Sequence, residues 1–252
     1  MFKPKTFKSK LFRALQVTAA VAAGFTEIGQ AKTIQTNELT ISNAPEWVTE
    51  SRVDRVVSRI QNKLEWSTRR TKVQWYTDST EYSNAHSLGP QAIAVTTSSG
   101  STSTVLIGPT VNAENFEHVL GHELVHVIVY QKYKGAIPKW LEEGLANHLA
   151  RPGQIDYKWL AKQPFPKDVR ELAHPMAATA GRSRNLAREM DIVRYRYKAS
   201  QALAEMLDKK CDLLNLVRMS VAKKMEPYIA TMCEIQDLNT AFREWVLKKS
   251  RS

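Results

Sequence analysis

A long apolar segment in the middle of the chain contains two histidines and a glutamate, in the order His-Glu-Leu-Val-His from His122 to His126. Apolar residues recur around it at three- and four-residue intervals, which predicts a helix over residues 113–133. Asn112 is a candidate N-cap of this helix, and Gly135 would end it. The apolar positions cover a broad face, so we expect the helix to be largely buried.

Two histidines separated by four positions on a helix project from the same face, one turn apart. His122 and His126 can therefore bind one metal ion, at the ~2.0–2.1 Å that a zinc–nitrogen bond requires. Glu123 lies next to the first histidine, where its carboxylate can face a water molecule rather than the metal and take its proton. The alternative is a helix with two hydrogen-bonded core histidines and a surface glutamate. The sequence favours a metal site, because such groups are costly to bury without a function.

A second helix is predicted at about residues 139–150 and carries the segment Trp-Leu-Glu-Glu-Gly, which starts at Trp140. Together the two segments resemble the gluzincin metallopeptidases, the thermolysin and aminopeptidase-N type of zincin, and especially the peptidase MA-like domains. The resemblance implies that Glu143 is the third zinc ligand, with Glu142 as the alternative. It also implies that Asn147, one turn later, supports a ligating histidine. Otherwise Asn147 is a solvent-exposed helix residue.

The resemblance extends to a downstream helix, where a Tyr-Lys-Ala segment at Tyr197 precedes a Met-Leu pair at Met206. In aminopeptidase-like members a tyrosine in this arrangement donates to the oxyanion formed during hydrolysis, which implies the same role for Tyr197. Tyr195 is the alternative, and either tyrosine could instead be a core residue. We expect His118, one turn before His122, to have a surface or packing role, because three ligands are already assigned.

The resemblance implies zinc-dependent hydrolysis of peptide bonds, with Glu123 as the general base and a peptide or protein as the substrate. The Gly-x-Met-Glu-Asn element of aminopeptidases is absent from the sequence, so we expect an endopeptidase rather than an aminopeptidase. The alternative is a catalytically silent, zinc-stabilised binding or structural protein of the same fold.

The order of predicted elements is that of an α+β fold, with a small mixed sheet and an N-terminal helix before the helix of the His-Glu-Leu-Val-His motif. An all-helical C-terminal half follows, and the resemblance implies that the fold is zincin-like. Residues 77–90 are rich in turn formers, and residues 154–184 are irregular. The expected strands are residues 73–76, 92–97 and 104–107, with a hairpin loop at 98–101, and the other expected helices are residues 45–64, 185–209, 213–223 and 238–247.

Residues 1–31 have the pattern of a secretory signal, with a basic start, an apolar run from Leu11 to Phe25 and small residues before the expected cleavage point. A retained N-terminal anchor is one alternative, and an amphipathic helix of the domain is another. We expect residues 32–44 to be a linker with little structure and residues 45–252 to form one domain. The protein is therefore expected to be secreted or periplasmic, and to contact a membrane only if the anchor is retained.

The formal net charge of +11 invites comparison with nucleic-acid-binding proteins. Five lysines and arginines lie in the first 31 residues, and the other basic residues are scattered through the helical segments. Scattered charge is typical of a solvated surface, so no nucleic-acid partner is expected.

The chain has two cysteines, Cys211 and Cys233, which lie in predicted helical segments. Their spacing is not that of a metal site. In an oxidising compartment they could form a disulfide, and two free buried thiols are the alternative.

Overall fold

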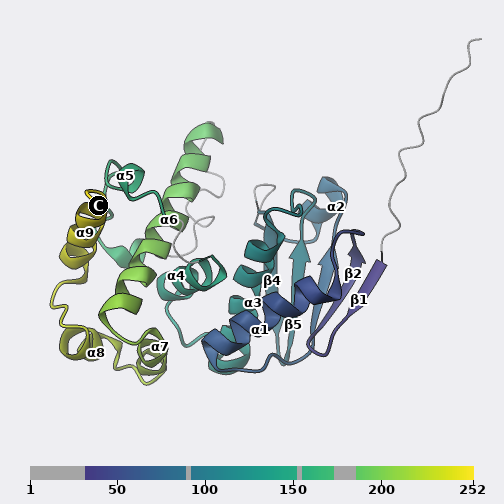
Figure 1. Cartoon of the computed structure of the whole chain (residues 1–252), viewed down its shortest axis with the longest axis horizontal. Helices are drawn as coiled ribbons and strands as arrows, with labels where there is room; N and C mark the ends of the chain where they lie inside the picture. The colour runs from purple at the N-terminus through teal and green to yellow at the C-terminus, as the bar shows by residue number, and fades with distance from the viewer. Residues whose placement is uncertain (1–31, 89–91, 152–154, 173–185) are drawn as a thin grey trace, which may run out of the picture.

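The computed structural model describes residues 32–88, 92–151, 155–172 and 186–252. The predicted signal segment, residues 1–31, lies outside the described residues. One half of the molecule is built around a sheet, and the other half consists of helices, with two helices at the junction (Figure 1). The α+β class and the helical C-terminal half are therefore confirmed.

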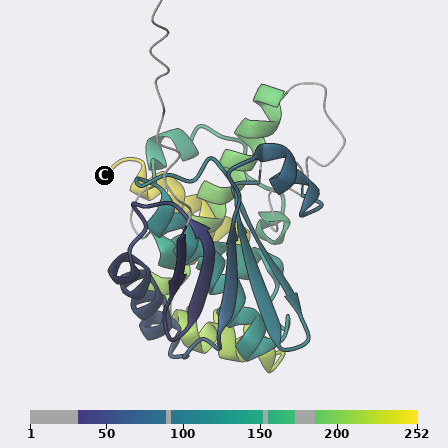
Figure 2. The same cartoon turned by 90° about the vertical axis from the view of Figure 1, so that its right-hand side faces the viewer.

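Within the described residues the sheet has five strands, in the order β1-β2-β3-β5-β4 (Figure 2). β2 runs parallel to β3, and β3 runs parallel to β5. The two outer pairs, β1 with β2 and β4 with β5, are antiparallel, so the sheet is mixed and β4 forms one of its edges. The strands are β1 (Lys32–Gln35), β2 (Leu39–Ala44), β3 (Thr71–Trp75), β4 (Ala94–Ser99) and β5 (Thr102–Ile107).

The three predicted strands correspond to β3, β4 and β5, but the hairpin loop is shorter than expected. Ser99 pairs with Thr102, which leaves a two-residue turn at Gly100 and Ser101. Gly100 has a φ of 59°, a conformation that glycine adopts without a steric penalty. Residues 77–90, predicted as turns, include the short helix α2 (Ser79–Asn84), capped by the Asp78 carboxylate.

The expectation that residues 32–44 form a linker is wrong, because they form β1 and β2. In β2 the side chains of Leu39 and Ile41 are fully buried, while Thr40 between them is partly exposed. β2 pairs with β3 across about 30 residues of chain, in the register Ile41 to Val73. The local sequence predicts β1 and β2 only weakly, because both strands are short and the pairing partner of β2 is far away along the chain.

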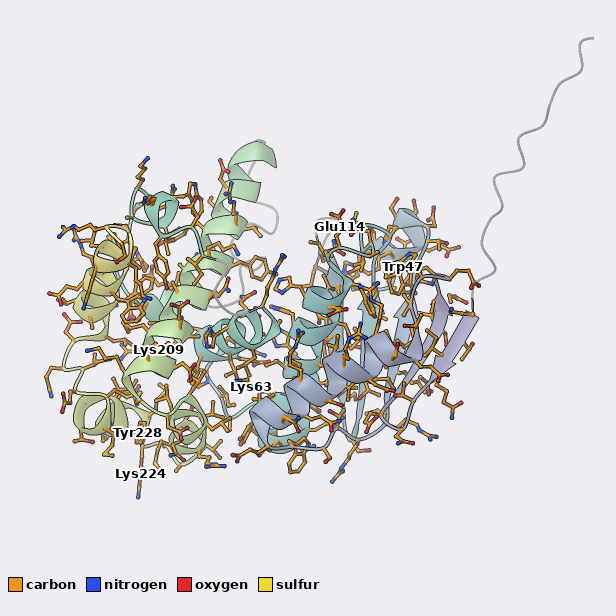
Figure 3. All side chains as sticks on the ribbon, in the orientation of Figure 1. Trp47, Lys63, Glu114, Lys209, Lys224 and Tyr228 are labelled. Carbon is orange, nitrogen blue, oxygen red and sulfur yellow. A yellow bond between two sulfur atoms is a disulfide. The ribbon has the colours of Figure 1, made fainter. Side chains whose placement is uncertain are left out.

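Helix α1 (Glu50–Leu64) begins five residues later than the predicted start at residue 45. The Thr49 hydroxyl accepts a hydrogen bond from the Arg52 N–H at 3.3 Å, and this cap sets the first turn. Trp47, labelled in Figure 3, lies just before the helix. It packs edge-on against Trp75 and Phe116, with ring centroids 5.5 and 5.6 Å away.

Two helices at the junction of the sheet and the helical half carry the predicted metal ligands. α3 (Phe116–Tyr133) begins three residues later than expected, because the Asn112 side chain accepts hydrogen bonds from the N–H groups of Glu114 and Asn115 and forms a turn instead of a cap. α4 (Lys139–Ala150) has the predicted bounds. The helical half contains α5 (Tyr157–Leu160), the 3-10 helix η1 (Val169–Leu172), α6 (Leu186–Lys210), α7 (Leu213–Val221), α8 (Met225–Met232) and α9 (Leu238–Lys249).

The helical half is cross-linked by a disulfide between Cys211, just after α6, and Cys233, just after α8. The two cysteines are thus paired, which settles the choice that the sequence left open. Among the helices of the described residues, none is long and apolar enough to cross a membrane.

The backbones of α4 and α6 approach each other closely at Gly144. A Cβ built on Gly144 would lie 2.7 Å from the carbonyl oxygen of Ser200 on α6. Only glycine permits this approach, since real Cβ atoms essentially never come so close to another atom.

Replacing Gly144 with alanine is expected to lower the free energy of unfolding by about 1–3 kcal/mol, because the added methyl group must push α6 away from α4. Urea denaturation measures the change. Gly121→Ala on α3 is the matched control. Its added Cβ would lie 3.2 Å from Nη2 of Arg59, which is the end of a flexible side chain. Equal destabilisation by the two substitutions would contradict the prediction.

Candidate metal centre

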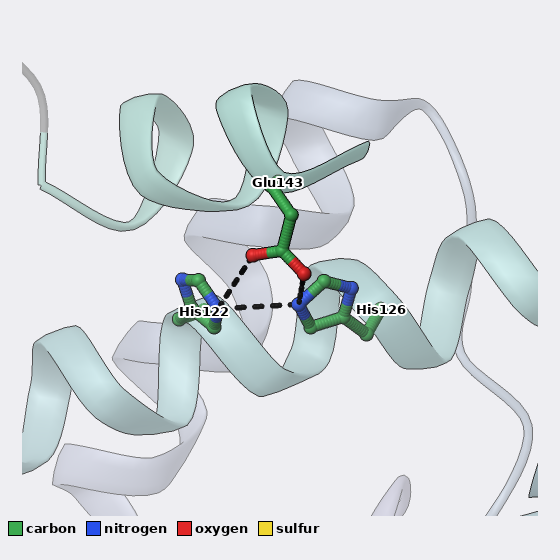
Figure 4. Close-up of side chains that lie close together, drawn as sticks. All are labelled: His122, His126 and Glu143. Atoms are coloured by element: carbon green, nitrogen blue, oxygen red, sulfur yellow. Dashed lines mark hydrogen bonds and ion pairs between the residues drawn. The ribbon is translucent and has the colours of Figure 1, made fainter. Parts of the chain in front are cut away.

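The structure brings together the three predicted ligands, His122 and His126 on α3 and Glu143 on α4 (Figure 4). The Nε2 atoms of the two histidines are 3.1 Å apart. The Glu143 carboxylate oxygens lie 3.7 Å from Nε2 of His122 and 3.8 Å from Nε2 of His126. One turn of α3 separates the histidines, and the packing of α4 against α3 places Glu143 over both of them.

These distances fit a shared metal ion. Ligand atoms that each lie ~2.0–2.2 Å from one tetrahedral ion are ~3.4 Å from each other. The two separations from Glu143, 3.7 and 3.8 Å, are too long for hydrogen bonds but close to this spacing. Two imidazole nitrogens and a carboxylate are also a common donor set of metal sites. The three side chains can therefore bind a metal ion.

The charge balance around the site also favours a cation. Burial raises the pKa of Glu143 and of Glu123 above the ordinary range of a glutamate. Burial alone would lower the pKa of His126, but the charge of Glu143 and the hydrogen bond to Glu142 outweigh it and raise this pKa to about 9. The shift of the His126 pKa reflects the carboxylates around it, and the shifts of the Glu123 and Glu143 pKa values reflect the cost of burying charged carboxylates. A metal ion would offset the cost of burying them together.

Glu142, the alternative ligand, has a different position. Nδ1 of His126 donates a 2.8 Å hydrogen bond to Oε1 of Glu142, and the Lys139 ammonium donates at 2.7 Å to Oε2. This bond leaves Nε2 of His126 as the atom that faces His122 and Glu143. A carboxylate on the far nitrogen of a ligating histidine fixes its orientation and increases its basicity. This role could not be predicted from the sequence, because the contact depends on how α4 packs on α3.

Glu123 directly follows His122 in the sequence and is buried, with 6% of its surface exposed. It is close enough to His126 and Glu143 for its charge to raise the pKa of both. Its Oε2 accepts a 2.6 Å hydrogen bond from the hydroxyl of Thr96 on the edge strand β4. Thr96 was not identified from the sequence. The only sequence signal was its position in a predicted strand, which does not reveal the neighbouring helix.

Tyr197 lies at the site. Its ring centroid is 6.0 Å from that of His122, and burial together with the charges of Glu143 and Glu123 raises its pKa above the ordinary range of a tyrosine. Tyr195 instead packs against the hydrophobic core, where burial raises its pKa to about 12. Residues two positions apart point to different sides of a helix, so only one of the two can face the ligands.

Asn147 is not the solvent-exposed residue of the alternative interpretation, since only 5% of its surface is exposed. Its amide donates hydrogen bonds to the carbonyl oxygen of Glu143 at 2.9 Å and to the hydroxyl of Ser200 at 3.3 Å. It thus ties the helix of Glu143 to α6 and contacts the backbone of a ligand rather than a histidine side chain. The expected support of a ligating histidine by Asn147 stays a prediction.

His118 does not belong to the group of ligands that the described residues form. It is half-buried on α3, with its ring centroid 6.3 Å from that of His122. Its position is consistent with the expected packing role.

Comparison with known proteins does not assign the chain to a family. No protein-family model matches the chain, and no curated protein matches it.

Zinc titration tests the separate roles of the two neighbouring glutamates. Glu143→Gln is expected to abolish stoichiometric binding, because it removes a charged ligand. Glu142→Gln is expected to weaken binding roughly 10- to 100-fold, because His126 loses the carboxylate that orients it. The exposed Glu226→Gln, on α8, is the control for the loss of one negative charge. The assignment is contradicted if Glu142→Gln binds zinc as tightly as the unmodified protein.

Proposed function

We propose that the protein is a zinc-dependent peptidase of the gluzincin type that cleaves peptide bonds as an endopeptidase. The observation that carries the proposal is the position of Glu123. It is buried beside His122, His126 and Glu143, and it is not one of these three metal-binding side chains. A general base next to a metal site with three protein ligands is the arrangement that hydrolysis by activated water requires.

The chemistry needs zinc together with groups from the chain. When bound, zinc supplies a Lewis acid that polarises the substrate carbonyl and lowers the pKa of a water molecule. His122, His126 and Glu143 would hold the ion, and Glu142 would keep the His126 ring in the binding orientation through its 2.8 Å hydrogen bond. Zinc is proposed because two imidazoles and one carboxylate are a frequent ligand set of catalytic zinc.

Glu123 takes the proton from the attacking water and later delivers it to the leaving amine. A base that must accept and return a proton works best when its pKa is closer to neutrality than that of an exposed carboxylate. Burial raises the pKa of Glu123 in this direction, although the charge of His126 and the hydrogen bond from Thr96 oppose it. The Thr96 hydroxyl holds one carboxylate oxygen at 2.6 Å, which leaves the other oxygen for the water.

Tyr197 donates a hydrogen bond to the oxyanion that develops on the substrate carbonyl. Its raised pKa keeps the phenol protonated and therefore able to donate at neutral pH. A fixed donor aimed at developing negative charge stabilises the transition state more than the ground state.

The edge strand β4 is suited to hold an extended peptide. Strand β5 pairs with one side of β4, and Thr96 in its middle contacts Glu123. An edge strand has unpaired N–H and C=O groups, to which a peptide can add as a further strand. Such pairing would align the scissile bond with the metal and with Glu123. The proposed zincin-like fold rests on this combination of an edge strand, the helix of His122 and the helix of Glu143.

We also propose that the protein acts outside the cytoplasm. Cys211 and Cys233 form a disulfide, and disulfides form and persist mainly in oxidising compartments. The signal-like pattern of residues 1–31 supports the same location.

Glu123→Gln is the decisive variant for the proposed reaction. It is expected to keep one equivalent of zinc while peptide hydrolysis falls at least about a hundredfold, because the amide cannot accept the proton. Zinc content and cleavage of a denatured-protein mixture, mapped by mass spectrometry, measure both effects. A zinc-loaded but wholly inactive unmodified protein would instead support the binding or structural alternative.

Tyr197→Phe is expected to lower kcat by roughly 10²- to 10³-fold with little change in KM, because it removes one donor to the oxyanion. Tyr195→Phe on the same helix is the matched control and is expected to leave kcat unchanged. A larger loss in the control than in Tyr197→Phe would assign the role to the other tyrosine.

A further inference from the structure

Lys139 lies at an unfavourable place for a cation, at the start of α4. It is the first residue of the helix, directly after Pro138. The N–H groups at a helix N-terminus already carry partial positive charge, so an acidic residue is favoured there over a lysine. The Lys139 ammonium donates a 2.7 Å hydrogen bond to Oε2 of Glu142, one turn later. This contact with a carboxylate offsets the unfavourable position.

The two partners of this ion pair differ in exposure. The side chain of Lys139 is 61% exposed, whereas that of Glu142 is only 5% exposed. An ion pair between two exposed side chains contributes little to stability, because water screens it. A buried carboxylate, in contrast, is costly unless donors reach it. Lys139 is therefore more than a surface charge, because it supplies a donor to a buried group.

The Glu142 carboxylate has one donor on each oxygen. Nδ1 of His126 donates to Oε1 at 2.8 Å, and the Lys139 ammonium donates to Oε2. Within the part of the chain that the structure describes, these are its two hydrogen bonds. The last torsion of a glutamate side chain is only loosely restricted, so a single hydrogen bond leaves the plane of the carboxylate free to turn. Two bonds, to donors on α3 and on α4, fix this plane.

We propose that Lys139 is a positioning residue of the metal centre, which acts through Glu142 on His126. It holds the plane of the Glu142 carboxylate, which in turn holds the His126 ring. The ring is thereby turned so that its Nε2 faces His122 and Glu143, at 3.1 and 3.8 Å. This inference rests on the zinc site of the proposed function, and it adds a residue that affects zinc affinity without touching the ion.

Lys139→Met is expected to weaken zinc binding roughly three- to tenfold, which is less than the usual effect of removing the carboxylate itself. Methionine keeps most of the length of the side chain but has no charge and no N–H donor. A lysine that acted only through its charge would repel the ion, so its removal would strengthen zinc binding. The two explanations thus predict changes of opposite sign. Titration against a competing chelator measures the dissociation constant, and unchanged or tighter binding overturns the inference.

Two further substitutions control for the loss of a surface lysine. Lys224 also lies at the start of a helix, directly before α8, and extends outward from the molecular surface (Figure 3). Lys224→Met is therefore expected to leave zinc affinity unchanged. Lys139→Arg keeps the charge and N–H donors, and it is expected to restore zinc affinity to within about twofold of the unmodified protein.

Glu142→Gln separates an effect through the carboxylate from a direct effect of Lys139. In the Glu142→Gln protein the lysine has lost its charged partner, so Lys139→Met is expected to change zinc affinity less than about twofold in that background. An equal loss of affinity in both backgrounds would contradict action through Glu142.

Cobalt(II) bound in place of zinc reports the geometry of the ligands through its visible absorption. Lys139→Met is expected to change this spectrum, because the His126 ring is held less firmly, while Lys139→Arg is expected to keep it. A lower free energy of unfolding with an unchanged spectrum and unchanged zinc affinity would give Lys139 a merely structural role and overturn the inference.

Metal binding separates this inference from the proposed function. If the unmodified protein binds zinc but cleaves no peptide, the proposed function fails, whereas weaker zinc binding by Lys139→Met still supports the inference. If the unmodified protein cleaves peptides and Lys139→Met binds zinc equally well, the inference alone is overturned.

Discussion

Three buried carboxylates, those of Glu123, Glu142 and Glu143, meet two imidazoles at the junction of α3 and α4. Protonated His126 and nearby Lys139 balance only part of this negative charge. Burial raises the pKa of Glu123 and Glu143, and a bound cation would lower the cost of keeping their carboxylates charged. The spacing of the donor atoms, between 3.1 and 3.8 Å, suits one such ion. A cation bound there would offset the cost of packing these acidic groups between the two helices.

The position of α4 decides whether the carboxylates reach the histidines. One side of α4 brings Glu142 and Glu143 to α3, and its Gly144 lets the backbone of α6 come close. The Asn147 amide reinforces this contact with Ser200. Because Tyr197 belongs to the same stretch of α6, one packing arrangement positions both Glu143, the proposed third ligand, and the proposed oxyanion donor. The helical half is thus part of the site rather than an appendage to it.

Local patterns predicted the longer helices well, the short helices α2, α5 and α8 not at all, and the sheet only in part. The observed bounds of α4 agree with the predicted ones, because Pro138 before the helix and Arg151-Pro152-Gly153 after it are local signals of where a helix begins and ends. The starts of α1 and α3 were placed three to five residues early, since Thr49 and Asn115, rather than Pro45 and Asn112, precede the first turns. β1 and β2 were missed. The stability of a short strand comes from its pairing partner, which for β2 is about 30 residues away.

The sequence determined that His122 and His126 share a helix face, because the geometry of an α-helix sets the direction of residues four apart. It also indicated Glu143 and Tyr197, through their resemblance to known segments. Tertiary structure alone decided that Glu142 orients His126, that Thr96 holds Glu123 and that Cys211 pairs with Cys233. Each of these contacts joins different elements. It depends on how one element is rotated against another, which local sequence does not encode.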